Sequence, residues 1–391
     1  MKKYAVLTRE PRCFLGSFDF SWEQRKAKEL CNIGTGKSNT QDQVEDGIYP
    51  FYIRSDIPVK SNKYLYDCEA VITIGDGNIG RVFHYVNGKF DLHQRCYKMT
   101  DFQDIWGKYF YYFFSTRFYD RAMKMTAKAT VDSVRLEMIS EMDIWKPTAI
   151  DEQKKIAEFF ANLDNLITLH QRKFEKLTNV KKSMLEKIFP QNGSSYPEIR
   201  FKGFTDPWEQ RKLGELGTIT TGSTPSTSIP DYYSDDGIVW VTPTDICENI
   251  TFESARKLSD LGQQVGRVVP KNTILVTCIA SIGKNTMLGN TGSFNQQING
   301  LTPNEKECDP YFLLTESALW SAKMKSSAAA GTMQIVNRTE FSELKTWLPN
   351  LIEQQAISDF FRQLDNLITL HQRELEKLQN IKKSMLEKMF V

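Results

Sequence analysis

The first candidate for chemistry is a glycine-rich segment. Residues 75–80, GDGNIG, match the G-x-G-x-x-G pattern of dinucleotide-binding sites. In such sites the glycines open a helix whose amino end faces the pyrophosphate of the cofactor. Residues 81–86, RVFHYV, instead have the β-branched and aromatic character of a strand. The segment is therefore predicted to be a tight loop between two strands rather than a nucleotide site.

Other catalytic constellations are incomplete in this sequence. Gly283-Lys284 lacks the earlier glycine and the following serine or threonine of a phosphate-binding loop. The four histidines have no metal-ligand spacing, and neither Gly-x-Ser-x-Gly nor the Asn/Asp-Pro-Pro-Tyr/Phe segment of base methylation occurs. The seven cysteines never form a Cys-x-x-Cys pair, which is typical of reduced, structural cysteines. We therefore predict no catalytic residue and no metal site in this chain.

The elements that organise the chain form an internal repeat. Residues 152–189 return almost unchanged as residues 353–390, and 27 of the 38 aligned positions are identical. Neither copy contains glycine or proline, so each is predicted to be one continuous helix of roughly 57 Å at about 1.5 Å per residue. Thr148 and Asn350, each with an acidic residue three positions later, are predicted to cap the two helices.

Apolar residues in both copies recur in steps of three and four, the heptad pattern of a coiled-coil seam. A histidine (His170, His371) and a lysine (Lys181, Lys382) interrupt each seam. The histidines are predicted to specify register rather than to act as catalytic bases. Packing of each helix on its own domain is an alternative, but a long seam with isolated polar positions favours a partner helix. The seam residues are Ile156, Phe160, Leu163, Ile167, His170, Phe174 and Leu177 in the first copy and Ile357, Phe361, Leu364, Ile368, His371, Leu375 and Leu378 in the second.

The repeat extends to the segments before the helices. Residues 21–26 and 207–212 share Trp-Glu-Gln-Arg-Lys, and each is followed by a Glu-Leu and a Thr-Gly pair. Short β-rich runs followed by helical patterns predict an α+β fold in which two mixed α/β domains are each followed by a long helix. The predicted segments are an N-terminal segment (1–20), a first domain (21–147), a first helix (148–190), a linker (191–207), a second domain (208–349) and a second helix (350–391).

The composition, 40% hydrophobic and 25% charged residues, is that of a globular protein. A net charge of +2 gives no basic footprint of the kind expected for strong DNA binding without a partner. No apolar run is long enough for a signal peptide or a membrane span, so a cytoplasmic location is expected.

Taken together, these motifs make the sequence resemble the specificity subunit of type I restriction-modification systems. The resemblance rests on Trp-Glu-Gln-Arg-Lys at both domain starts, Glu-Gln-x-x-Ile at both helix starts and Leu-Asp-Asn-Leu-Ile-Thr-Leu-His-Gln within both helices. It covers essentially the whole chain. It implies two target-recognition domains that each read one half of a bipartite, asymmetric DNA site, and two helices paired as an antiparallel coiled coil. Such a subunit carries no catalytic centre of its own.

Connectivity independently favours the antiparallel arrangement. The second domain begins only a linker after the first helix ends, and it feeds the start of the second helix. If the two helices pair, they must therefore run in opposite directions, which relates the two halves by a pseudo-two-fold axis.

The same resemblance implies the partners. These are double-stranded DNA, methyltransferase (modification) subunits of a DNA adenine methyltransferase, expected in two copies, and motor-nuclease (restriction) subunits. S-adenosylmethionine, ATP and Mg²⁺ are expected in those partner subunits and not in this chain. The helices are expected to dock the methyltransferase subunits and to set the gap between the half-sites.

Polar residues in loops that follow strands can reach base edges and phosphates. This criterion selects positions in the middle of each domain and one threonine before each helix. For each of them a turn or solvent role fits the sequence equally well. The candidates are Asn78, Arg81, His93, Gln94, Arg95 and Thr130 in the first domain and Lys284, Asn285, Asn295, Gln296, Gln297 and Thr332 in the second.

Two other classes of function stay open at this point. One is a stand-alone nuclease that uses dispersed carboxylates, and the other is a coiled-coil scaffold that binds no DNA. Co-purification with a methyltransferase subunit, followed by a gel shift with and without it, distinguishes all three.

Overall fold

The computed structural model describes residues 21–125, 133–191, 193–279, 282–329 and 335–390. The chain divides into two compact units, of which the first contains Met1–Gln171 with Arg373–Val391 and the second Arg172–Gln372. Each unit combines β-sheets with helices, so the predicted α+β fold with two domains and two long helices is confirmed.

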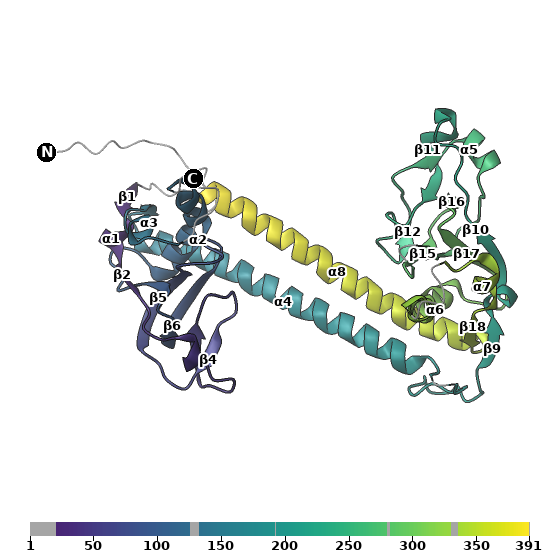
Figure 1. Ribbon diagram of the computed structural model, residues 1–391, viewed down its shortest axis with the longest axis horizontal. Coiled ribbons are helices and arrows are strands. Elements are labelled where there is room, and N and C mark those ends of the chain that lie inside the picture. The colour runs from purple at the N-terminus through teal and green to yellow at the C-terminus, as the bar shows by residue number, and fades with distance from the viewer. Residues whose placement is uncertain (1–20, 126–132, 192, 280–281, 330–334, 391) are drawn as a thin grey trace. The chain divides into compact units, whose positions relative to one another are not determined.

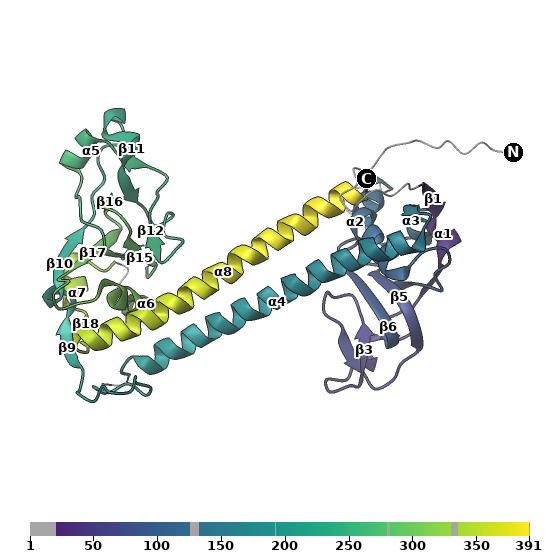
Figure 2. The same cartoon turned by 180° about the vertical axis from the view of Figure 1, so that it is seen from behind.

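The main sheet of the first unit has six strands in the order β2-β7-β5-β6-β3-β4. Its neighbours are antiparallel except β3 and β6, which run parallel and lie side by side in Figure 2. The strands are β2 (Asn32–Thr35), β3 (Tyr49–Tyr52), β4 (Val59–Ser61), β5 (Tyr66–Ile74), β6 (Phe83–Leu92) and β7 (Cys96–Thr100). A separate antiparallel pair, β1 (Trp22–Lys26) and β8 (Asp143–Pro147), joins the start and the end of the domain. Because β5 ends at Ile74 and β6 begins at Phe83, residues 75–80 are the predicted loop between two strands.

Helix α2 (Gly107–Lys124) packs on this sheet through contacts with β5 and β6 (Figure 1). Its aromatic residues Phe110, Phe114 and Phe118 are fully buried, and their spacing of four places them on one face of the helix. That face supplies much of the core of the first domain. The shorter helical elements are α1 (Ala27–Leu30), η1 (Thr40–Asp42) and α3 (Leu136–Ser140).

The second unit repeats this plan with insertions. Its five-stranded sheet has the order β10-β17-β14-β15-β12, in which the first four strands correspond to β2, β7, β5 and β6. A three-stranded sheet, β13-β11-β16, and an antiparallel pair, β9 with β18, complete the unit. The strands are β9 (Glu209–Lys212), β10 (Gly217–Thr221), β11 (Tyr233–Val241), β12 (Ile250–Thr251), β13 (Lys257–Leu258), β14 (Ile274–Thr277), β15 (Asn285–Leu288), β16 (Gly292–Phe294), β17 (Ile298–Pro303) and β18 (Lys345–Leu348).

Helix α6 (Pro310–Ala329) packs on β14 and β15 of the second unit, as α2 does on β5 and β6 of the first. The inserted residues between β11 and β14 carry β12, β13 and α5 (Asp260–Val265). The remaining helical elements are η2 (Leu213–Glu215), η3 (Pro230–Tyr232) and α7 (Arg338–Glu343).

The two repeat segments are the long helices α4 (Ile150–Ile188) and α8 (Leu351–Met389), each of 39 residues. Asn350 caps α8 as predicted, because its Oδ1 accepts a hydrogen bond from the Glu353 amide at 3.0 Å. The prediction for Thr148 is wrong. Helix α4 begins at Ile150, so Ala149 precedes its first residue, and the Thr148 hydroxyl instead lies 3.2 Å from that of Ser21.

Within each unit, segments of the two helices pack against each other in antiparallel directions. In the first unit the ring of Phe390 lies 5.7 Å from that of Phe160, and Lys382 Nζ lies 2.5 Å from Asp164 Oδ1. Along α4 these contacts run from 160 to 164, whereas along α8 they run back from 390 to 382. The second unit has the equivalent contacts between α4 and α8, which confirms the predicted opposite directions.

The predicted seam positions are buried or half-buried in both helices. Ile156, Phe160 and Leu163 are buried, as are Ile357, Phe361 and Leu364. The later seam positions are half-buried and include both histidines: Ile167, His170, Phe174, Leu177, Ile368, His371, Leu375 and Leu378.

The lysines that interrupt the seam have specific acidic partners. Lys382 pairs with Asp164 in the first unit, and Lys181 pairs with Asp365 at 2.6 Å in the second. Each aspartate also accepts a hydrogen bond from a tyrosine hydroxyl of its domain, Tyr112 at 2.7 Å and Tyr311 at 2.9 Å. One aspartate on each repeat helix therefore contacts both the partner helix and one of the two domains.

Glu316 on α6 is a buried acid and leads to a prediction on pH. Its Oε1 accepts a hydrogen bond from the Trp347 amide at 3.2 Å, and among the described residues its Oε2 has no hydrogen-bond partner. Burial raises the pKa of this carboxyl to about 7, although hydrogen bonds from Thr346 and Trp347 act in the opposite direction. Above a pH of about 4.5 the unfolded chain loses this proton while the folded chain retains it, so stability is highest below that pH and falls up to about pH 7.

Glu316→Gln should remove this dependence, because the amide stays neutral. We expect the variant to be more stable than the parent at pH 8, by up to about 3 kcal/mol, and equal to it near pH 4. Thermal unfolding across this pH range measures the difference. Glu248→Gln is the matched control, since Glu248 is exposed in the same domain and should give the parental profile. Parallel profiles for the parent and Glu316→Gln would contradict the assignment.

Candidate nucleic-acid interface

Three loops of the first domain meet at one edge of its sheet. They are residues 53–55 after β3, residues 75–82 between β5 and β6, and the turn 93–95 between β6 and β7. The amide of His93 donates to the Tyr52 carbonyl at 3.0 Å, and the amide of Gly75 donates to the Arg95 carbonyl at 2.7 Å. These backbone bonds connect all three loops.

The predicted DNA-contact residues of this domain gather at these loops but differ in exposure. Asn78, Gln94 and Arg95 are exposed. Arg81 is also exposed, and its guanidinium lies 4.8 Å from the centre of the Tyr119 ring. These four side chains are placed where they could reach a ligand.

His93 is only 4% exposed and has a structural role. Its Nδ1 accepts a hydrogen bond from the Arg95 amide at 3.1 Å, which closes the turn. Burial, followed by the charges of Arg54 and Arg95, lowers the pKa of His93 and favours the neutral ring that such an acceptor requires. The DNA contact predicted for His93 stays a prediction.

An acidic residue links two arginines at the same edge. Asp76 Oδ2 lies 2.8 Å from Arg95 Nη1, and both Asp76 oxygens lie 3.3 Å from Arg54 Nη1. Partial burial opposes ionisation of Asp76, but the hydrogen bonds and charges of Arg95 and Arg54 outweigh it and lower the pKa of the carboxyl. Arg54 and Asp76 are not among the residues predicted from the sequence. Asp76 lies within the glycine-rich motif of residues 75–80, which is interpreted as a loop. The sequence around Arg54 contains no motif that would have selected it.

The second domain builds the same turn from different residues. Asn295 takes the place of His93, and its Oδ1 accepts from the Gln297 amide at 3.0 Å. The Asn295 amide donates to Val241, as that of His93 does to Tyr52. The loose alignment of residues 92–95 with 294–297 thus corresponds to a shared turn.

The second-domain candidates occupy mixed environments. Lys284 is exposed and its Nζ donates to the Pro243 carbonyl at 3.0 Å. Gln296 is exposed and accepts from the Thr224 hydroxyl, and Gln297 is half-buried beside it. Asn285 and Asn295 are structural, since Asn285 Oδ1 accepts from the Ser321 hydroxyl at 2.6 Å and Asn295 closes the turn.

Thr130 and Thr332, the two predicted threonines, lie outside the described residues. A DNA contact by any of the twelve candidate residues stays a prediction.

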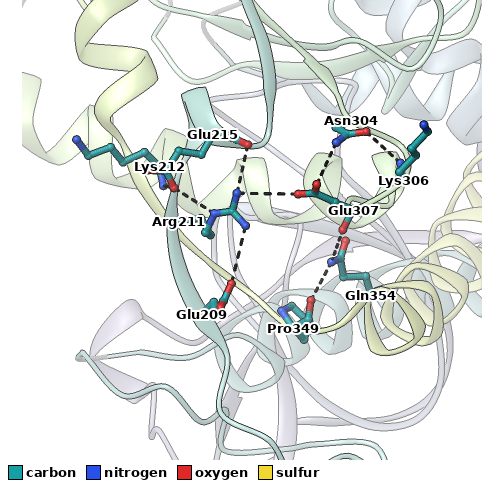
Figure 3. Close-up of polar contacts among 9 residues, drawn as sticks. All are labelled: Glu209, Arg211, Lys212, Glu215, Asn304, Lys306, Glu307, Pro349 and Gln354. Atoms are coloured by element: carbon teal, nitrogen blue, oxygen red, sulfur yellow. Dashed lines mark hydrogen bonds and ion pairs between the residues drawn. The ribbon is translucent and has the colours of Figure 1, made fainter.

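The repeated domain starts are structural and do not belong to this interface. Arg25 Nε pairs with Glu29 at 2.7 Å, and Arg211 Nε pairs with Glu215 at 3.1 Å. Figure 3 shows Arg211 among Glu209, Glu215 and Glu307, with Gln354 nearby. The Gln354 side chain donates through Nε2 to the Glu307 and Pro349 carbonyls at 3.1 and 2.8 Å, which ties the start of α8 to its domain.

The repeated Thr-Gly pair has a steric origin. A Cβ on Gly36 would lie 2.2 Å from the Leu92 carbonyl oxygen, and a Cβ on Gly222 would lie 2.1 Å from that of Asn295. Only glycine allows β2 and β10 to pass this closely beside the two shared turns.

In the part of the chain that the structure describes, no group of three or more His, Cys, Asp and Glu side chains is arranged to hold a metal ion. No described helix combines the length and apolar character needed to cross a membrane. The six described cysteines are free, and burial raises the pKa of Cys31 and of Cys96 to about 12.

Comparison with known proteins identifies the family. The model of the type I restriction modification DNA specificity domain matches residues 21–179 and again residues 205–380. The chain belongs to this family, with two copies of its domain.

Relatives among curated proteins carry corresponding names. The MjaVIII specificity subunit of Methanocaldococcus jannaschii is 24% identical over 394 residues, covering 93% of this chain and 91% of the relative. The MjaIX specificity subunit of the same organism is 27% identical over 47% of this chain, and the HindI specificity subunit of Haemophilus influenzae is 29% identical over 41%. The chain spans 44% and 37% of the length of these last two relatives.

A solved structure shares the fold of this specificity-domain protein. The S subunit of a type I restriction-modification system from M. genitalium superposes with a TM-score of 0.72, covering 97% of this chain and 99% of that one at 14% identity. At this identity the likeness concerns the fold alone.

Proposed function

We propose that this chain is the DNA-specificity subunit of a type I restriction-modification complex. Each domain reads one half of a bipartite, asymmetric DNA site, and the helices set the gap between the halves. The observation that carries the proposal is the duplicated edge: both domains build the same turn with the same backbone bonds but present different side chains on it. A shared framework with different side chains is what two readers of different half-sites require.

Recognition, not catalysis, is the task of this chain in the complex. S-adenosylmethionine, ATP and Mg²⁺ would be bound by the methyltransferase and motor-nuclease subunits. The cytoplasmic location expected from the sequence stays a prediction.

The docking surface for the methyltransferase subunits is a duplicated helix face. Each copy lines a shallow hollow. At the shared positions the two copies differ only by Val180 in place of Ile381, and the second hollow also includes Lys388. The first copy lies on α4 in the second unit, and the other lies on α8 in the first unit. The equivalent residues are Arg172, Glu175, Lys176, Asn179, Ser183 and Met184 on α4 and Arg373, Glu376, Lys377, Asn380, Ser384 and Met385 on α8.

Four residues of each face are exposed, so the packing of the two helices does not require their identity: Arg172, Glu175, Lys176 and Asn179 on α4 and Arg373, Glu376, Lys377 and Asn380 on α8. Met184 and Met385 instead pack against the hydrophobic cores of their units. Two equal surfaces fit two copies of one partner. Two leucines on each helix are also exposed at equivalent positions, Leu166 and Leu169 on α4 and Leu367 and Leu370 on α8. Exposed apolar side chains at the same positions of both helices are typical of a surface that a partner protein buries.

The test compares the purified chain with its complex. Alone, with S-adenosylmethionine, ATP and Mg²⁺, the chain should neither methylate nor cleave DNA. After assembly with the methyltransferase subunit of its own system, the complex should methylate one defined bipartite site and shift DNA containing it. Cleavage of DNA by the purified chain alone would instead support the hypothesis of a stand-alone nuclease. An assembled complex that binds no DNA would support the scaffold reading.

Docking on the two faces predicts a change in stoichiometry. Lys176→Glu and Lys377→Glu each reverse one charge on one face, so each should weaken one docking site by about 10-fold or more. Each single variant should bind one methyltransferase subunit where the parent binds two, and the double variant should bind none, as measured by native mass spectrometry.

Lys173→Glu is the control, because the second copy naturally carries Glu374 at the equivalent position and the change should leave docking intact. Two bound subunits in the double variant would contradict docking on these faces.

A further inference from the structure

The two arginines held by Asp76 keep one edge of each guanidinium available. In the described residues both contact Asp76 through Nη1, with Arg95 at 2.8 Å and Arg54 at 3.3 Å. The Nε and Nη2 atoms form the opposite edge, with two parallel N–H donors. Arg200 uses this edge in the second unit, where Nε and Nη2 each lie 2.8 Å from an oxygen of Glu353.

Asp76 is the less exposed member of this group, and Arg54 and Arg95 are the more exposed ones. The Asp76 side chain is 19% exposed, whereas those of Arg54 and Arg95 are 47% and 61% exposed. The backbone around Asp76 is fixed on both sides, because Gly75 donates to the Arg95 carbonyl and Val134 donates to that of Gly75, each at 2.7 Å. A fixed acceptor lowers the number of orientations the two long side chains can adopt.

The second domain lacks this group at the same positions. The Asn295 amide donates to the Val241 carbonyl, as that of His93 does to Tyr52, so Pro243 is the counterpart of Arg54. The Cys278 amide donates to the Gln297 carbonyl, as that of Gly75 does to Arg95, so Gln297 is the counterpart of Arg95. Ile279 then corresponds to Asp76. Both residues form an isolated β-bridge, Ile279 with Ile335 and Asp76 with Ser133. The second domain therefore presents an uncharged amide where the first presents two arginines.

We propose that Arg54 and Arg95, positioned by Asp76, read guanine in the half-site of the first domain, whereas the second domain reads its half-site without arginine at these positions. Guanine offers two acceptors, O6 and N7, on its major-groove edge, and their spacing matches two parallel N–H donors. Asp76 is a positioning residue, since it acts through the arginines. The proposal rests on the DNA-recognition function proposed above and adds the base that is read.

The experiment uses the complex of the full chain with its methyltransferase subunit and sequences the sites that it methylates in a random library. The parent should require guanine at one or more positions of one half-site. Arg95→Gln should lower the preference for one of these guanines by about 10-fold or more, since a bidentate contact contributes about 1–3 kcal/mol of discrimination. Arg54→Gln should do the same, and both should leave the other half-site unchanged.

Two further variants distinguish recognition of guanine from non-specific electrostatic attraction to DNA. Arg95→Lys keeps the charge but loses the paired donors, so guanine preference should fall while overall affinity is retained. Asp76→Asn adds one net positive charge and releases both arginines, so overall affinity should stay equal or rise while the preference falls. Damage to the fold would instead lower both quantities. Lys89→Gln is the charge-matched control on an exposed position of β6 and should leave the selected base unchanged.

The outcomes separate this inference from the function on which it rests. If the parental complex selects no defined site, the recognition function itself falls. If the parent selects a bipartite site but Arg95→Gln, Arg54→Gln and Asp76→Asn select the same bases, the guanine assignment is wrong. A loss of affinity that is uniform across all sequences would show that the arginines contact phosphate instead, and would also overturn it.

Discussion

Replacing residues 213–344 with the corresponding segment of another specificity subunit is expected to change one half of the methylated site completely and to leave the other half unaltered. The junctions follow from the structure. The Leu213 amide donates to the Leu344 carbonyl at 2.9 Å, so the two ends of the exchanged segment are already adjacent. Strands β9 and β18 stay with the host chain, together with the contact between Phe189 and Trp208. The exchanged segment therefore carries the candidate DNA-contact residues of the second domain. It also carries Tyr311, which donates a hydrogen bond to Asp365 on α8, so the donor segment should have a tyrosine at this position.

The reciprocal exchange is the matched control. Residues 27–142 form the equivalent segment of the first domain, because the Ala27 amide donates to the Met142 carbonyl at 2.9 Å. This exchange should replace the other half-site. Sequencing of methylated sites from a random library measures both results. Alteration of both halves by either exchange, in a complex that still assembles, would contradict independent domains.

A second large effect is expected from shortening both helices by one heptad. Deletion of residues 171–177 together with 372–378 removes seven residues from each helix, which keeps the seam in phase. Each helix becomes shorter by roughly 10 Å at about 1.5 Å per residue. Both ion pairs, Lys382 with Asp164 and Lys181 with Asp365, lie outside the deleted segments. The aspartate and the lysine of each shortened helix would then be ten positions apart instead of 17, in both helices alike, so the ion pairs can still form.

The preferred gap between the half-sites should then shorten by about three base pairs, at about 3.4 Å per base pair. Three base pairs also rotate one half-site by nearly a third of a helical turn, so the DNA must twist or bend and binding should weaken. A library of both half-sites with variable gaps measures the preferred spacing. An inserted heptad at the same positions is the matched control and should lengthen the gap. An unchanged gap with normal binding would show that the helices do not set the distance.

The helices were predictable because their information is local and duplicated. A seam with a period of three and four residues is visible in any stretch of chain, and two copies with 27 of 38 identical positions confirm each other. The start of α4 was misplaced because Thr148 has the residue type of a cap but forms a hydrogen bond with Ser21. Local residue preference identified a hydroxyl without identifying its partner.

The partners of the two lysines that interrupt the seam could not be predicted from the sequence. Lys181 and Lys382 read as isolated polar residues along their own helices. Their partners Asp365 and Asp164 lie on the other helix, more than 180 residues away in each case. The type of residue was visible in the sequence, whereas the pairing depends on the antiparallel alignment of two helices.

The group of loops that carries the first-domain candidates depended on tertiary structure most of all. Residues 93–95 and 75–80 could be selected from sequence because turns have characteristic residues. The link of Arg54 to Asp76 and Arg95 could not, since these residues lie on three separate loops and meet only through the pairing of β3, β5, β6 and β7. Strand register decides which loops share an edge, and it is set by packing across the whole sheet rather than by neighbours in the chain. For the same reason the burial of His93, a polar residue in a turn, could not be predicted from the sequence.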